Sequence, residues 1–101
     1  MFRHVVLMTW GPGTTGDQVS AVLDGLAGLP AAIPDIRAYS FGTDAGLAPD
    51  NADLAVVADF DDEDGYRAYA AHPAHVALVT EHIRPILASR TAVQYRTGTE
   101  S

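Results

Sequence analysis

The sequence predicts an α+β domain in which a four-stranded antiparallel sheet carries helices on one face. Two observations predict it: four short segments have the composition of strands, and two longer regions have the periodicity of helices. Their order is β-α-β-β-α-β, which is the ferredoxin-like arrangement. A chain of 101 residues, 48% of them hydrophobic, has room for one such domain and for no second one.

The first strand and the first helix open the domain. Residues 2–10 alternate, so that one face of the strand carries His4, Val6, Met8 and Trp10. After Gly11-Pro12-Gly13, Thr14 or Thr15 can cap a helix whose apolar residues recur at helical spacing: Val19, Val22, Leu23, Leu26 and Leu29. We expect residues 30–34, Pro-Ala-Ala-Ile-Pro, to form a loop.

The second half repeats this alternation of strands and helices. Strands are predicted at about 36–42 and 53–60, with a polar loop at 43–52 between them. The acidic residues 61–64 favour a helix start, and the helix continues over 66–71. Pro73 interrupts it and restarts a helix that runs to about residue 87, which Pro85 should bend or terminate. A fourth strand at 91–95 completes a single domain over residues 1–97, and 98–101 form a polar tail.

Both faces of the predicted sheet are apolar. On the first strand Val5 and Leu7 are as hydrophobic as Val6 and Met8, and the third strand barely alternates. Helices on one side leave the other side of an antiparallel sheet open to water. We therefore expect a homodimer in which two sheets pack face to face into a closed, barrel-like core.

The composition excludes several classes of function. With 13 acidic and 6 basic residues the net charge is −7, which argues against binding to nucleic acid or to an anionic membrane surface. No apolar run approaches the roughly 20 residues that span a bilayer, and the N-terminus lacks a signal-peptide layout, so we expect a cytoplasmic protein. The absence of cysteine excludes disulfides, thiolate nucleophiles and Cys-ligated zinc.

One segment indicates chemistry, because Tyr69-Ala70-Ala71-His72-Pro73-Ala74-His75 gathers a phenol and two of the four imidazoles. Pro73 suits the first position of a helix, with His72 as its cap. Tyr69 then ends one short helix and His75 lies in the first turn of the next, so that both side chains can converge on one cavity. His75 could act as a general base, and Tyr69 could donate a hydrogen bond to the oxyanion that develops.

His4 is expected on the wall of the same cavity, together with the apolar side chains of Val6, Met8 and Trp10. Simpler roles compete with catalysis: His72 caps the helix, His75 bonds a carbonyl, and Tyr69 fills core with its hydroxyl at the rim. His72 and His75 also form a possible pair of metal ligands, but the sequence offers no motif with a third or fourth one.

Four pieces of the sequence together resemble the stress-responsive A/B barrel domain family over nearly the whole chain. They are Arg3-His4-Val5-Val6-Leu7-Met8, Tyr66-x-x-Tyr69-x-x-His72-Pro73-x-His75, Arg90, and Ala92-Val93-Gln94-Tyr95. The resemblance implies a ferredoxin-like protomer in a dimeric α+β barrel. The family includes plant stress proteins and a plant polyketide cyclase, olivetolic acid cyclase, which closes a linear tetraketide by an aldol condensation without a metal requirement.

The resemblance also implies roles for particular residues. Tyr69 and His75 match the catalytic pair of the cyclase, and His4 matches a histidine that lines its pocket. A further pocket histidine of the cyclase falls at Leu54, and Val56 on the same strand is expected in the pocket wall with His72. Family structures that hold a hard cation on backbone carbonyls imply a corresponding site here, at the carbonyls of three residues: Pro30, Ile33 and Ile36.

Three functions are compatible with these residues. The first is a small cofactor-independent cyclase, aldol-type enzyme or isomerase that acts on an apolar, polyketide-like or β-dicarbonyl compound. The second is a non-enzymatic stress-responsive or ligand-binding barrel. The third is a monooxygenase of the related dimeric α+β barrels, which needs a haem ligand or a flat quinone pocket.

Overall fold

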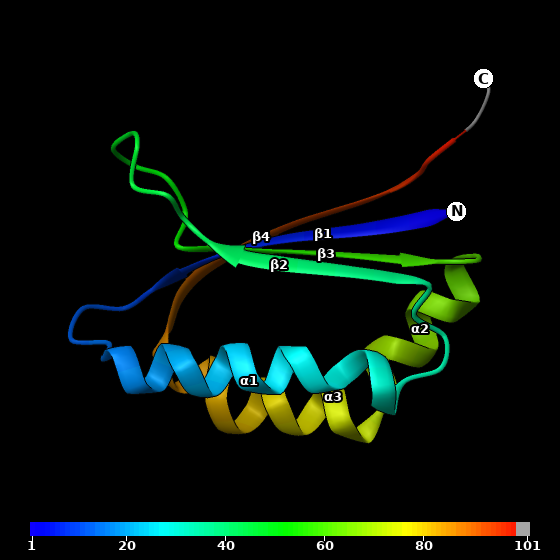
Figure 1. The fold of residues 1–101 in the computed structure, drawn as a ribbon, viewed down its shortest axis with the longest axis horizontal. Coiled ribbons are helices and arrows are strands. Elements are labelled where there is room, and N and C mark those ends of the chain that lie inside the picture. Colours follow the sequence, from blue (N-terminus) through cyan, green and yellow to red (C-terminus); the bar gives the residue numbers. More distant parts are fainter. Residues whose placement is uncertain (99–101) are drawn as a thin grey trace.

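The protein has two layers, a sheet and a layer of helices (Figure 1), and the computed structural model describes residues 1–98. Its elements in chain order are β1 (Phe2–Trp10), α1 (Gly16–Ala32), β2 (Ala38–Thr43), β3 (Leu54–Phe60), α2 (Glu63–Ala71), α3 (Pro73–Leu78), η1 (Val79–Ile83), η2 (Arg84–Ile86) and β4 (Leu87–Arg96). The four strands are antiparallel to their neighbours in the order β2-β3-β1-β4. The predicted ferredoxin-like α+β fold is confirmed. Most of the predicted tail, residues 99–101, lies outside the described residues.

The two faces of the sheet differ because the helices cover only one of them (Figure 1). His4, Val6 and Met8 point into the core beneath the helices and are at most 6% exposed. The neighbouring Leu7 is 41% exposed on the opposite face. We call that uncovered side the open face, and its apolar side chains come from β1, β3 and β4: Val5, Leu7, Ala55, Val57, Val93 and Tyr95.

A capping box starts helix α1. The Thr15 hydroxyl accepts a hydrogen bond from the Gln18 N–H at 3.2 Å, and the Gln18 side chain accepts one from the Thr15 N–H at 2.9 Å. These two bonds satisfy backbone donors that a helix start leaves without partners. The helix then buries one stripe of side chains against the sheet: Val22, Leu26 and Leu29.

The loop expected at residues 30–34 is wrong, because α1 continues through Pro30 to Ala32. A proline near a helix end removes only one backbone donor, and the N–H of Ile33, three residues later, still bonds the Leu29 carbonyl at 2.9 Å. Ile33 is fully buried, so its packing holds the last turn in place. The apolar contact outweighs the local preference of proline.

The single helix expected from Pro73 to about residue 87 is also wrong, because it is three short pieces. The α-helical turns of α3 widen into the π-helix η1 and then tighten into the 3-10 helix η2, which ends at Ile86. Within η1 the Arg84 N–H bonds the Val79 carbonyl five residues back. Pro85 has no N–H to continue an α-helix and its ring crowds the preceding turn, which accounts for the termination expected there.

Two strands have boundaries that differ from the predicted ones, because the length of a strand depends on pairing with its neighbour, which a local sequence pattern does not show. β2 begins at Ala38 rather than Ile36, and β4 covers Leu87–Arg96 rather than 91–95. β4 is long because it pairs with β1 from Phe2 to Trp10, with one irregularity at Thr9/Trp10. Within residues 1–98, the helices are too short or too polar to cross a membrane.

The open face generates a prediction about assembly. Val93 is 55% exposed there, and Val93→Asp places a charge on a surface that we expect to be buried between two copies. Light scattering after size-exclusion chromatography should give twice the 10.7 kDa chain mass for the wild type and a mass close to one chain for the variant. Val76→Asp is the matched control, because Val76 is similarly exposed, at 46%, but lies on α3. A wild type that elutes as a monomer would contradict the expected dimer.

Candidate functional site

A cavity of about 340 Å³ lies between the helices and the part of the sheet formed by β1, β3 and β4. It brings together His4, Tyr69 and His75, the three side chains proposed from the sequence. Val6, Met8 and Val56 also line it, as the sequence analysis expects. The other lining residues come from α1, η1, η2 and β4: Leu26, Val79, Ile83, Arg84, Leu87 and Arg90.

The break between α2 and α3 positions Tyr69 and His75. His72 adopts an extended conformation, φ −65° and ψ 136°, and its Nδ1 accepts a hydrogen bond from the Ala74 N–H at 3.1 Å. Pro73 follows at the first turn of α3, as predicted. This change of direction leaves the Tyr69 and His75 rings with centroids 4.4 Å apart and planes tilted by 43°. The structure therefore brings the two side chains together from two different helices.

The hydrogen bond of His75 defines which ring nitrogen is available for chemistry. Nδ1 lies 3.2 Å from the Ala70 carbonyl oxygen, which can only accept. Nδ1 must therefore carry the proton in the neutral ring, and Nε2 keeps its lone pair. Burial lowers the pKa of His75 below 6.5, opposed by the Ala70 bond and assisted by the positive charge of Arg90. At neutral pH His75 is a neutral imidazole with a free basic nitrogen.

His4 has the opposite arrangement. The Gln94 amide nitrogen donates to its Nδ1 at 2.8 Å, so the proton of the neutral ring lies on Nε2. Burial, with smaller contributions from Arg90 and His75, lowers the pKa of His4 to about 4. His4 is thus a neutral hydrogen-bond donor on the wall of the cavity, complementary to the acceptor at His75.

Tyr69 has a partner that the sequence analysis missed, the hydroxyl of Tyr39 on β2. The two phenol oxygens are 3.1 Å apart. When Tyr39 donates this bond, the O–H of Tyr69 is left to donate to a ligand. Burial raises the pKa of both phenols, so both stay protonated at neutral pH.

The sheet register explains why Tyr39 and Gln94 reach the site. Ala58 pairs with Tyr39 on one side and with His4 on the other, and His4 pairs with Gln94. These four residues form one row across the sheet, which we call the Tyr39–Gln94 row. The Tyr69 ring centroid is 6.2 Å from that of Tyr39 and 6.3 Å from that of His4. The small side chain of Ala58, between the two, leaves space for Tyr69.

Three residues expected in the pocket wall do not line this cavity: Trp10, Leu54 and His72. Trp10 follows the irregularity in the β1–β4 pairing and packs half-buried at the edge of the core. Leu54 is buried beside Met8, and His72 turns its ring back to cap α3. The position that the resemblance assigns to a pocket histidine is therefore a core position here.

The side chains of the described residues offer no candidate metal site. No group of three or more His, Asp or Glu residues is arranged to hold a metal within residues 1–98. Of the carbonyls proposed for a hard cation, at Pro30, Ile33 and Ile36, that of Ile33 accepts a hydrogen bond from the Ile36 N–H at 3.2 Å. Binding of a cation at these carbonyls stays a prediction.

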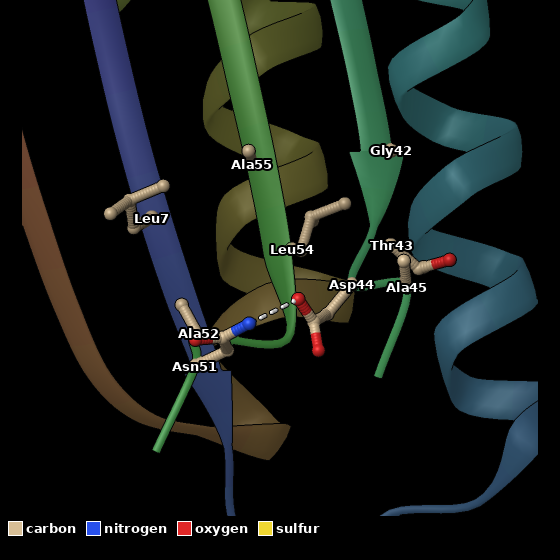
Figure 2. A pocket seen from close by; sticks show the side chains of 9 residues that line it. All are labelled: Leu7, Gly42, Thr43, Asp44, Ala45, Asn51, Ala52, Leu54 and Ala55. Carbon is tan, nitrogen blue, oxygen red and sulfur yellow. Dashed lines mark hydrogen bonds between the residues drawn. The ribbon is translucent and has the colours of Figure 1, made fainter. Parts of the chain in front are cut away.

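A second depression, of about 420 Å³, lies where the β2–β3 loop meets the sheet (Figure 2). Its ionisable side chain, Asp44, is already bonded to the Asn51 amide at 3.0 Å and to the Gly46 N–H at 3.0 Å. The rest of its lining is small or apolar apart from Thr43. It is larger than the first cavity but its lining contains no imidazole, no phenol and no second charged group, so we place the candidate site at the first.

The lowered pKa of His4 predicts how stability depends on pH. In the unfolded chain the ring protonates near 6.5, whereas in the folded protein it does so only at about 4. The free energy of unfolding should therefore fall as pH drops from 6.5 towards 4, by up to about 3 kcal/mol from this group. Urea unfolding at several pH values measures it. His4→Gln should flatten the decline, and exposed His82→Gln should not; equal slopes in all three proteins would contradict the assignment.

Comparison with known proteins places the chain in a family. The model described as "Stress responsive A/B Barrel Domain" matches residues 2–97. A dimeric ferredoxin-like protein of unknown function from Thermobifida fusca is 52% identical, with TM-score 0.86, over 93% of this chain and 88% of that one. A dimeric protein of unknown function from Bacteroides fragilis is 25% identical, with TM-score 0.83, over 94% of each chain.

More distant similarity is to the fold alone. A hydroxynitrile lyase from Passiflora edulis is 17% identical, with TM-score 0.83, over 99% of this chain and 96% of that one. The comparison with curated proteins gives no match. The family model and the 52% identical relative together show that this chain belongs to the stress-responsive A/B barrel domain family.

Proposed function

We propose that the protein is a small cofactor-independent enzyme that removes a proton from a carbon next to a carbonyl group, and that the enolate then undergoes an aldol-type ring closure or an isomerisation. The observation that carries the proposal is the pairing of a neutral His75, with Nε2 free, and a protonated Tyr69 in one apolar cavity. Base and oxyanion donor are the two groups that enolate formation needs.

In the first step Nε2 of His75 takes the proton, and the electron pair of the C–H bond moves into the carbonyl to form the enolate. The O–H of Tyr69 and the Nε2–H of His4 donate to the enolate oxygen. The imidazolium that forms on His75 keeps its Nδ1–H bond to the Ala70 carbonyl, which stabilises the positive charge. Apolar walls at Val6 and Met8 exclude water and strengthen these interactions.

In the second step the enolate carbon attacks a second carbonyl carbon of the same molecule. A carbon–carbon bond forms from the C=C electron pair of the enolate, and the enolate oxygen becomes a carbonyl again. The π electron pair of the attacked carbonyl moves onto its oxygen, which becomes an alkoxide. The imidazolium of His75 returns its proton to that oxygen, so the catalyst is restored and no oxidant or reductant is used. If no second carbonyl is in reach, return of the proton to a different atom gives an isomerisation.

The comparisons support the proposal at the level of the fold. A hydroxynitrile lyase has the same fold, so the fold can house a lyase, but at 17% identity the activity does not carry over. Polyketide cyclisation is the finer form of the proposal and rests on the matching Tyr69 and His75. A non-enzymatic barrel and a monooxygenase are the alternatives, and the cavity beside His4, Tyr69 and His75 favours an enzyme over a barrel filled by its own side chains.

The central pair can be tested with a simple β-dicarbonyl probe. In D₂O the wild type should accelerate exchange of the α-proton of ethyl 2-methylacetoacetate, followed by ¹H NMR. Tyr69→Phe and His75→Ala should each lower the catalysed rate by about tenfold or more, because each removes a group that acts in the transition state.

The matched control for this experiment is His82→Ala, which removes an exposed imidazole far along the same helical region and should keep the wild-type rate. Circular dichroism checks that each variant is folded. Wild-type exchange rates in both His75→Ala and Tyr69→Phe would contradict the mechanism.

Tyr39 should have a smaller effect than Tyr69. Tyr39→Phe removes the donor that fixes the Tyr69 hydroxyl but leaves that hydroxyl in place. A neutral hydrogen bond of this kind contributes about 1 kcal/mol, so we expect roughly a fivefold loss of kcat with little change in KM. Steady-state kinetics of Tyr39→Phe, Tyr69→Phe and the double variant test this. If Tyr39→Phe lowered kcat by the same factor in the Tyr69→Phe background as in the wild type, the two residues would not act through one another.

A further inference from the structure

Two of the six basic side chains, Arg84 and Arg90, differ from the other four. The four others form ion pairs with carboxylates, namely Arg3 with Asp59, Arg37 with Asp61, Arg67 with Asp64 and Arg96 with Glu63. Within residues 1–98, neither Arg84 nor Arg90 forms an ion pair or donates a side-chain hydrogen bond. Both line the cavity that contains Tyr69 and His75.

This placement is unusual for so acidic a chain. The protein has 13 acidic residues against 6 basic ones, yet the cavity lining contains two guanidinium groups and neither Asp nor Glu. The sign of the charge inside the cavity is therefore opposite to the net charge of −7. Both arginines are exposed, and a guanidinium without a protein carboxylate at the edge of a cavity is free to pair with an anion from outside the protein.

The two arginines approach the cavity from different layers. Arg90 pairs with Met8 in the β1–β4 ladder, two residues from Ala92 and four from Gln94, so it lies on the same face as His4. Arg84 begins η2, directly after the π-helix. The charge of Arg90 also reaches the proposed reacting groups, because it adds to burial in lowering the pKa of His75 and opposes burial at Tyr69.

We propose that the ligand of this cavity is an anion, a small apolar molecule whose carboxylate is held by Arg90 and Arg84 while its carbonyl faces Tyr69 and His75. The position of the carbonyl rests on the proposed function, whereas recognition of the carboxylate does not. The planar fork of a guanidinium matches the two oxygens of a carboxylate. The apolar walls fit the rest of the molecule, and a cavity of about 340 Å³ is at the small end of ligand pockets.

This ligand class narrows the proposed reaction. A keto acid would enter with its carboxylate at the arginines and its reacting carbon beside Nε2 of His75. The positive charges of Arg84 and Arg90 would also stabilise the second negative charge that enolate formation adds to the molecule. A neutral substrate would leave Arg84 and Arg90 without a partner in the described part of the chain.

The test uses binding rather than turnover, with benzoate as the probe and neutral benzamide as its isostere. Isothermal titration calorimetry at low salt should show benzoate binding the wild type at least about tenfold more tightly than benzamide, because a charge-assisted bidentate pair is lost in the amide. Added NaCl should weaken benzoate binding and leave benzamide unchanged. This comparison needs no variant, so it stands even if one fails to fold.

Variants then show which residues cause the preference for benzoate over benzamide. Arg90→Gln and Arg84→Gln should each weaken benzoate binding by about three- to tenfold without changing benzamide binding. Arg67→Gln is the matched control, since Arg67 is an exposed arginine paired with Asp64 on α2, and it should bind like the wild type. Benzoate and benzamide of equal affinity, or a loss that is the same in all three variants, would overturn the proposal.

Two further experiments distinguish this proposal from the binding of another oxyanion and from the proposed enzymatic function. Phenyl phosphate carries the other common oxyanion, and tighter binding of it than of benzoate would overturn the assignment to a carboxylate. His75→Gln should still bind benzoate within about threefold of the wild type, because the imidazole is not the anion's partner. If the wild type prefers benzoate through its arginines but does not accelerate α-proton exchange, the proposed function has failed and the carboxylate site stands. Accelerated exchange without a preference for benzoate would show the reverse.

Discussion

The candidate site depends on the register of one row across the sheet. Tyr39, Ala58, His4 and Gln94 lie side by side on β2, β3, β1 and β4, all on the face of the sheet that carries the helices. Gln94 sets the tautomer of His4, Tyr39 bonds Tyr69, and Ala58 gives the Tyr69 ring its space. A shift of any strand by one residue would turn its member of the row to the open face. The pairing of strands, which also builds the fold, therefore fixes the chemistry.

The second constraint is the break in the helical layer. His72 and Pro73 end α2 and start α3, which lets Tyr69 and His75 come from different helices and meet. The wide turns of η1 then bring Val79, Ile83 and Arg84 to the cavity. A continuous helix from Glu63 to Ile86 would distribute these side chains around one cylinder. The irregular backbone of the helical layer and the regular pairing of the strands thus both position side chains around the same cavity.

Much of this could be predicted from local patterns, and the failures have physical causes. The alternation of β1 correctly grouped His4 with Val6 and Met8 on one face, and the sequence around Pro73 correctly placed the helix start. Tyr39 could not be found because its role comes from the register of β2 against β3. Pro30 misled because burial of Ile33, a tertiary contact, holds the last turn of α1. Trp10 was assigned to the pocket from its strand face and Leu54 from the family resemblance, and neither shows where the helices leave space in this chain.

The claim that His75 is a neutral base with a free Nε2 is tested most directly by ¹⁵N NMR of its imidazole across pH. The account predicts that the neutral ring is protonated at Nδ1 and that the pKa of His75 lies below 6.5. The ¹⁵N shifts should also show Nε2 unprotonated at neutral pH, with His4 as the opposite tautomer. A His75 ring protonated at Nε2, or a pKa above 6.5, would contradict the account, because Nε2 would then already carry the proton that it has to receive.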